Sequence, residues 1–234
     1  MNAAGWRPPP KDRVRRVQQR LREVYGVPRN VPHSRPVDEL VLTVLSQSTS
    51  DRNRDRAYAQ LTRTFPDWAA VRDAPPAEVV DAIRGGGLAN QKAPRIQAIL
   101  RGLGSELDLG WLRTADRERA LEFLVSLPGV GRKTAACVLL FSYGHPEPPV
   151  DVHVGRVGAR LGLLPESGTA DRLHDDMRST LRDLDPHEIH INLLRHGRRT
   201  CRPDPHCERC DLRRMCPWQR EHGSWASPSS KATK

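Results

Sequence analysis

The chain has 234 residues, a net charge of +10 and 37% hydrophobic residues, which suits one domain or two small ones with a heavily charged surface. No apolar run approaches the roughly 18 residues that a membrane-spanning helix needs, and residues 1–16 lack the apolar stretch of a signal peptide. We therefore expect a cytoplasmic protein without membrane contact, whose positive charge favours a polyanionic partner, nucleic acid first.

Apolar residues recur at helical spacing along most of the chain. The first predicted helix, over residues 14–24, is rich in Arg and stops at Gly26-Val27-Pro28. The next, Val37–Ser46, is apolar enough to be buried. Further helices are expected over about 52–64, 76–84, 91–104, 116–126, 132–143, 151–162, 170–182 and 186–197, with Pro, Gly or Asp at nearly every junction. No strand and no fixed repeat is evident, so we expect an all-α fold of about ten helices.

Charge is concentrated at the two ends of the chain. Residues 1–34 carry eight Arg or Lys, and residues 195–220 carry eight Arg. The two ends could come together on one basic face, or they could form two independent solvated surfaces. The polar residues 223–234 are expected to be disordered. Of the 38 basic residues only five are Lys, and three of these lie outside the tail: Lys11, Lys92 and Lys133.

The first chemical motif is LPGVGRKTA, residues 127–135. A helix ends at Leu127, and a turn with Gly129 and Gly131 leads into a new helix near Arg132. Glycines let the backbone turn tightly and approach a partner closely, and amide N–H groups at the start of a helix suit a phosphate oxygen. The pattern predicts a helix-hairpin-helix element, which grips a nucleic-acid backbone without reading its sequence. An ordinary helical corner is the simpler alternative.

The second motif is PVDVHV, residues 149–154, which follows the Pro-rich link HPEPP. Asp151 stands where a helix N-cap is expected, and capping alone would explain it. Only one helix and a loop separate it from Lys133, so a turn of the chain could bring the carboxylate towards the amine. A buried Lys beside a carboxylate is a plausible nucleophile.

The third motif is Cys201-x5-Cys207-x2-Cys210-x5-Cys216. A tight cluster of cysteines in an intracellular chain indicates a metal site rather than a disulfide scaffold. A [4Fe–4S] cluster and a four-cysteine zinc site both suit these residues, although only one of the paired CxxC knuckles that zinc usually prefers is present. Cys137 lies in the apolar segment AACVLLF and is expected in the core.

Taken together, LPGVGRKTA, then VDVH, then the four-cysteine loop resemble the endonuclease III family of DNA glycosylases of base excision repair. The similarity runs from about Asp38 to Cys216. LSQSTSD (45–51) is similar to the family's segment after the first barrel helix, and GGGLANQKA (85–93) to its lesion-probing loop. The resemblance implies a two-lobed, all-α fold. A six-helix barrel with the helix-hairpin-helix would span 36–146, a helical iron–sulfur domain would combine 1–35 with 147–217, and 218–234 would be a disordered tail.

Carried over by position, the resemblance implies that Lys133 is the nucleophile and Asp151 the essential carboxylate. The amine would attack C1′ of a flipped-out nucleotide and displace the base, and β-elimination through the Schiff base would then cut the strand. The adenine glycosylase branch lacks Lys at this position, so Lys133 favours a bifunctional glycosylase and AP lyase. The remaining DNA contacts implied are Gln47 or Ser48 on the orphan-base side, Leu88 as the wedge, Gly129, Gly131, Arg132 and Thr134 at the hairpin, and His153, which could shape the pocket or simply pack.

The implied cofactor is a [4Fe–4S] cluster held by Cys201, Cys207, Cys210 and Cys216. The implied partner is double-stranded DNA with damaged bases or abasic sites, bound by a monomer associated with the nucleoid of a bacterial or archaeal cell. The first Cys interval is one residue shorter than the family's usual spacing, and LSQSTSD stands where the common bacterial form is closer to LSAQATD. The family resemblance makes oxidised pyrimidines the leading expectation, and these departures leave the lesion preference open. The alternatives are a monofunctional uracil or mismatch glycosylase, and a weakly active paralogue that mainly binds damaged or abasic DNA.

Overall fold

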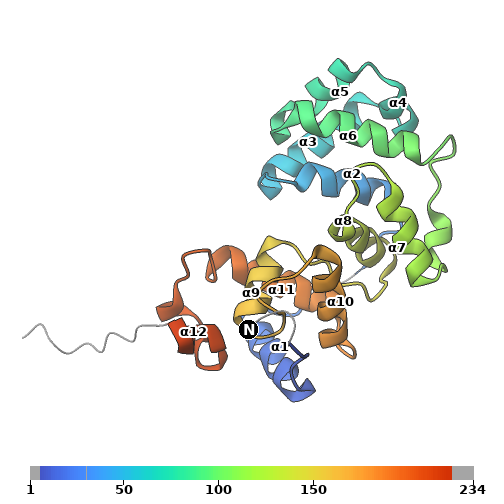
Figure 1. The fold of residues 1–234 in the computed structure, drawn as a ribbon. Coiled ribbons are helices and arrows are strands. Elements are labelled where there is room, and N and C mark those ends of the chain that lie inside the picture. Colours follow the sequence, from blue (N-terminus) through green and yellow to red (C-terminus); the bar gives the residue numbers. More distant parts are fainter. Residues whose placement is uncertain (1–5, 30, 223–234) are drawn as a thin grey trace, which may run out of the picture. The chain divides into compact units, whose positions relative to one another are not determined.

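The computed structural model describes residues 6–29 and 31–222, and the expected disorder of residues 223–234 lies outside them. Helices dominate and no strand occurs among the described residues, which confirms the predicted all-α fold (Figure 1). None of the described helices is long and apolar enough to cross a membrane. The α-helices are α1 (Lys11–Tyr25), α2 (Pro36–Ser46), α3 (Asp51–Thr64), α4 (Trp68–Asp73), α5 (Pro76–Ile83), α6 (Ala89–Gly102), α7 (Arg117–Ser126), α8 (Arg132–Cys137), α9 (Val152–Arg160), α10 (Ala170–Leu181), α11 (Pro186–Arg199) and α12 (Pro217–His222).

Five shorter helical segments complete the described chain. One is a π-helix, η3 (Val138–Ser142), which continues α8 without a break. Together α8 and η3 account for the single helix expected over 132–143. The others are the 3-10 turns η1 (Arg84–Gly86), η2 (Gly110–Arg113), η4 (Cys207–Arg209) and η5 (Arg213–Met215).

The chain divides into two units with separate hydrophobic cores. The terminal unit combines Met1–Pro28 with Val150–Lys234, and the central unit is Arg29–Pro149. The boundaries expected from the sequence were 35/36 and 146/147, so each lies a few residues from the observed one. The two chain ends therefore pack into one unit, although most of the sequence lies between them.

A buried carboxylate attaches α1 to the rest of the terminal unit. Glu188 on α11 is 1% exposed and accepts hydrogen bonds from Gln18 Nε2 at 3.0 Å and from Arg22 Nε and Nη2 at 2.9 and 2.7 Å. The apolar side of α1 faces the same way, because Val14, Val17 and Leu21 recur at helical spacing and are all buried. A partly basic helix is thus fixed by apolar burial on one side and by charge-assisted bonds beside it.

The most apolar helix, α2, lies at the centre of the central unit. It packs against α3, α6 and α8, and Leu40 and Val44 have no exposed surface. Because α2 is surrounded by other helices, nearly all of its side chains are buried, which explains why its sequence lacks a polar face.

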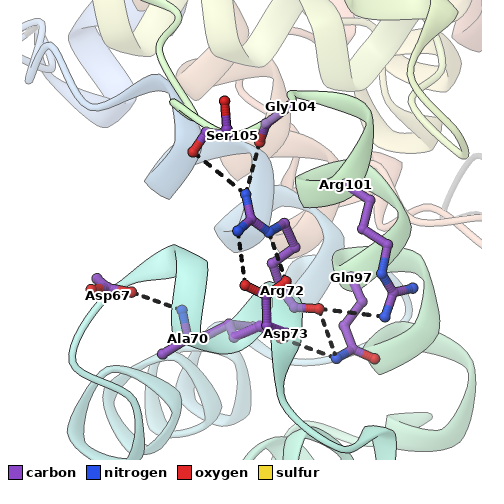
Figure 2. Close-up of polar contacts among 9 residues, drawn as sticks. Asp67, Ala70, Arg72, Asp73, Gln97, Arg101, Gly104 and Ser105 are labelled. Carbon is purple, nitrogen blue, oxygen red and sulfur yellow. Dashed lines mark hydrogen bonds and ion pairs between the residues drawn. The ribbon is translucent and has the colours of Figure 1, made fainter.

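Two short helices differ from the sequence expectations. The six-residue α4 was not predicted, since it is too short to show a helical period; the Asp67 side chain caps it by accepting from Ala70 N at 2.7 Å. Gln97 on α6 holds its end through bonds to the carbonyls of Val71 and Ala74 at 3.0 and 2.8 Å, in the network of Figure 2. The second difference is α12, whose residues 218–222 were assigned to the disordered tail.

The reason for α12 is local. Pro217 occupies the first helical position, where a missing N–H costs nothing. Trp218 packs against the core of the terminal unit, and its ring lies 4.3 Å from the Arg160 guanidinium. Partial burial of one aromatic ring therefore orders a polar segment that composition alone would leave flexible.

Two arginines share one buried carboxylate in the central unit. Glu147 is 1% exposed and accepts from Arg117 Nε at 2.7 Å and from Arg132 Nη2 at 2.7 Å. Arg117 opens α7 and Arg132 opens α8, while Glu147 lies in the segment that leaves the unit. The carboxylate thus ties three separate parts of the chain together.

Replacing Glu147 by Ala is expected to lower the free energy of unfolding by about 3–5 kcal/mol, because two guanidinium groups would lose their buried partner. The measurement is urea unfolding followed by circular dichroism. The matched control is Glu118→Ala, which removes an exposed carboxylate bonded to the same Arg117 at 2.9 Å and should change little. Equal losses for the two variants would contradict the role given to Glu147.

Candidate active site

The predicted hairpin is a tight corner between α7 and α8. Val130 N donates to Leu127 O at 3.1 Å, and Gly129 has φ +76°, in the left-handed region that favours glycine. Gly131 is the N-cap of α8, and a Cβ placed there would meet nothing within 4 Å. Both glycines are exposed, so the corner presents backbone rather than side chains to its surroundings.

The side chains after the corner face different surroundings. Lys133, the second residue of α8, is half-buried, whereas Thr134 is 4% exposed and turned into the core. Arg132 is bound to Glu147 at 2.7 Å. The structure thus gives Arg132 and Thr134 positions inside the unit, and their predicted contact with DNA stays a prediction.

Two segments with unusual backbone conformations carry the other predicted DNA contacts of the central unit. Gln47 ends α2, and the exposed Ser48 after it has φ +51°. Leu88, in the Gly-rich segment before α6, has φ +54° and is 49% exposed. A left-handed conformation is uncommon for residues with a Cβ and is often found at functional sites. An exposed leucine in that conformation is therefore shaped to project from the surface.

Arg95 on α6 is a site residue that was not predicted. Its Nη1 donates to Gln47 Oε1 at 2.6 Å, and a Cβ built on Gly129 would lie 3.0 Å from its Cγ and Cδ. The side chain therefore lies against both the Gln47 segment and the hairpin corner, and brings two of the predicted contacts together. The sequence shows only a basic residue three positions after Lys92, and its exposure is known from the structure.

Asp151 and His153 belong to the terminal unit. Asp151 caps α9: its Oδ1 accepts from His153 N at 2.9 Å and from Val154 N at 2.8 Å, so the capping expected from the sequence is present. His153 lies close to α11, because a Cβ on Gly197 would come within 2.9 Å of its own Cβ. Its ring Nδ1 is 3.1 Å from Arg156 Nη2, which fits the packing role. Since Lys133 lies in the central unit, its pairing with Asp151 stays a prediction.

The four clustered cysteines line one cavity in the terminal unit, together with Arg160, His196 and Trp218. Arg160 Nη1 lies 3.4 Å from Cys201 Sγ, and His196 Nε2 lies 3.6 Å from Cys210 Sγ. Burial raises the pKa of the Cys207 and Cys216 thiols and raises that of Cys210 to about 11. A metal centre binds cysteine as the thiolate, so a bound metal would have to supply the positive charge that offsets the burial of these groups.

Two metal centres use four cysteines. One zinc ion requires four sulfurs about 2.3 Å from a common point. In a [4Fe–4S] cluster each cysteine binds its own iron, so the sulfurs stand farther apart. Among the described residues, no three Cys, His, Asp or Glu side chains are grouped closely enough to hold a single metal ion. The four cysteines around this cavity are a donor set that either centre can use.

Comparisons with known proteins agree with this arrangement. The family described as HhH-GPD superfamily base excision DNA repair protein matches residues 41–182. Endonuclease III of Thermotoga maritima is 34% identical over 213 residues, which cover 88% of this chain and 95% of that protein. A protein of Arabidopsis thaliana named as a candidate DNA glycosylase is 36% identical over 165 residues, which span 69% of this chain and only 56% of that protein.

Solved structures show the same likeness. Endonuclease III trapped as a covalent intermediate with DNA superimposes with a TM-score of 0.76 and 25% identity, covering 91% of this chain and 98% of that one. The family match spans more than half of the chain, and the Thermotoga protein is covered almost throughout. The chain therefore belongs to the HhH-GPD superfamily of base excision DNA repair proteins and is a DNA glycosylase of the endonuclease III type.

Proposed function

We propose that this glycosylase also has AP-lyase activity and acts on oxidised pyrimidines in double-stranded DNA. Lys133 carries the proposal: it is the one lysine at the hairpin corner, in the same unit as the exposed Leu88 and the partly buried Gln47. The similar endonuclease III structure, a covalent intermediate with DNA, supports an amine that bonds to the sugar. The net charge of +10 supports a partner rich in phosphate.

The chemistry follows from the two residue types. The Lys133 amine attacks C1′ of an everted nucleotide, and the bond from C1′ to the base breaks with its electron pair leaving on the base. Asp151 takes the proton that the amine loses. The sugar ring then opens: the C1′–O4′ bond breaks, O4′ takes up the proton from Asp151, and a protonated imine is left between Nζ and C1′. The imine makes the C2′ proton acidic, and its removal breaks the bond from C3′ to the 3′ oxygen. Hydrolysis of the imine then frees the enzyme.

The Lys133→Ala variant is expected to lose borohydride trapping on DNA with an oxidised pyrimidine, because no imine can form for the hydride to reduce. The measurement is the shifted protein–DNA band on a denaturing gel. Lys11→Ala is the matched control, since Lys11 is one of the few other lysines and is bound to the exposed Asp183. Undiminished trapping by Lys133→Ala would refute the assignment of the nucleophile.

The wild-type protein separates the alternative functions in the same assay. A monofunctional glycosylase for uracil or mismatched bases would release free base and leave abasic sites that are cut only by alkali. A weakly active paralogue would bind abasic DNA tightly with no covalent trapping. Either result would overturn the lyase proposal and keep the membership of the family.

The Asp151→Asn variant tests whether this residue does more than cap α9. An asparagine oxygen can still accept from His153 N and Val154 N, so the melting temperature should stay within a few degrees of the wild type. Removal of the charge should lower the single-turnover rate of base excision by about 100-fold or more, as expected for loss of a general base. An unchanged rate would leave Asp151 with the capping role alone.

We also propose that the four-cysteine cavity holds a [4Fe–4S] cluster that orders the loop from Cys201 to Cys216. A protein purified without oxygen should be brown, absorb broadly near 400 nm (about the range typical of such clusters) and contain about four irons. Cys210→Ser should lose much of this absorbance. A colourless protein with one zinc per chain would contradict the proposal.

A further inference from the structure

A buried lysine lies beneath the two exposed segments of the central unit. Lys92 on α6 is 3% exposed, and its Nζ donates to Leu45 O at 2.8 Å and to Gly86 O at 3.1 Å. Neither acceptor is a carboxylate, so the residue is not half of an ion pair. Burial lowers its pKa, so its position has a cost that other contacts must offset.

The two carbonyls belong to the two segments that carry predicted DNA contacts. Leu45 lies in the last turn of α2, two residues before Gln47, and Gly86 is the last residue of η1, two residues before Leu88. The backbone of Lys92 adds a third attachment, because its N–H donates to Leu88 O at 2.9 Å. One residue is thus bonded to both segments.

The same segments need such support. Ser48 and Leu88 both have positive φ, which costs of order 1 kcal/mol or more and persists only where neighbouring contacts hold it. Gly86 also approaches α3, since a Cβ there would lie 2.8 Å from Ala57 Cβ. The helix α3 begins directly after the segment that holds Ser48. The two segments are therefore linked through α3 as well as through Lys92.

The choice of residue is informative, because 33 of the 38 basic residues are Arg. A guanidinium is a planar fork suited to carboxylates and phosphates, whereas an amine is a compact donor that fits between two carbonyl oxygens. Composition therefore sets Lys92 apart in the same way as Lys133. At position 92 a lysine is needed for the geometry of its hydrogen bonds, whereas at position 133 it is needed for the chemistry of its amine.

We infer that Lys92 is a positioning residue for base eversion, which holds the Gln47–Ser48 segment and the Leu88 wedge in register so that they can fill the DNA duplex when a base leaves it. This inference rests on the proposed function, because it takes those residues as DNA contacts. Lys92 touches no reacting atom, so its loss should weaken the step that unstacks a base more than the step that cuts the strand.

The test compares Lys92→Met in two single-turnover reactions that both need Lys133. Excision of thymine glycol from a duplex requires eversion of a stacked base, whereas β-elimination at a preformed abasic site has no base to unstack. We expect the excision rate to fall more than tenfold and the elimination rate to fall less than threefold. Equal losses in both reactions would mean a merely structural role and would overturn the inference.

Gln97→Met is the matched control. Gln97 lies on the same helix, is 1% exposed and also donates from its side chain to backbone carbonyls, those of Val71, Ala74 and Arg72, none of which belongs to the DNA segments. Figure 2 shows its contact with Arg72. Its loss should change both rates by the same factor. If Lys92→Met does not fold, Lys92→Gln keeps two amide donors on a shorter stem, and the same ratio of rates decides.

A second readout needs no turnover. With 2-aminopurine opposite an abasic site, binding of wild-type protein should raise the fluorescence as the orphan base unstacks, and saturating Lys92→Met should give less than half of that rise. The same rise for both proteins would refute the inference. A wild-type protein that neither excises nor cuts would instead refute the proposed function, and the fluorescence comparison would still decide the role of Lys92.

Discussion

A single buried carboxylate organises the part of the central unit where the chemistry is proposed. Glu147 binds Arg117 at the start of α7 and Arg132 at the start of α8, so one side chain fixes the first residues of both helices of the hairpin. The corner between them is therefore free to consist of exposed backbone and glycine. Rigid support from buried charges and two exposed glycines together suit close approach to a phosphate chain.

Support of this kind recurs in the molecule. Glu188 joins α1 to α11 in the same way that Glu147 joins the helices of the hairpin. Lys92 joins the segments around Ser48 and Leu88. In each case a buried polar side chain joins segments that are distant in sequence. Buried polar groups cost free energy unless they are satisfied, but when satisfied they favour one arrangement over its competitors. Segments with unfavourable backbone conformations can then persist at the surface.

Much of this could be read from the sequence, and the reasons for the exceptions are physical. Long helices such as α1 and α11 bury a periodic set of apolar residues, so their pattern predicts them, whereas α2 is predicted by its largely apolar composition. The helix α4 is held by the cap of Asp67 and by Gln97, and α12 is held by the burial of Trp218, none of which has a period. The motifs gave Lys133 and the four cysteines because a local pattern carries them.

Residues that act across the sequence were harder to find. Arg95 contacts Gln47 and Gly129 only in the folded chain. In the sequence Glu147 is a single acidic residue in a Pro-rich link, and nothing there shows that it binds two arginines. The inward position of Thr134 was likewise hidden, because it is a polar residue that follows the half-buried Arg132 and Lys133. Local motifs therefore point to candidate reactive groups, whereas the contacts that position them depend on tertiary structure.

The terminal unit is discontinuous, and this sets an order of events during synthesis. Residues 29–149 form a unit with its own core and can collapse as soon as they emerge from the ribosome. In contrast, α1 has to wait, with its apolar side uncovered, until α11 and Glu188 have been translated. The arginines along α1 give this waiting segment a charge that resists self-association. The last part of the chain to be made therefore completes the first part.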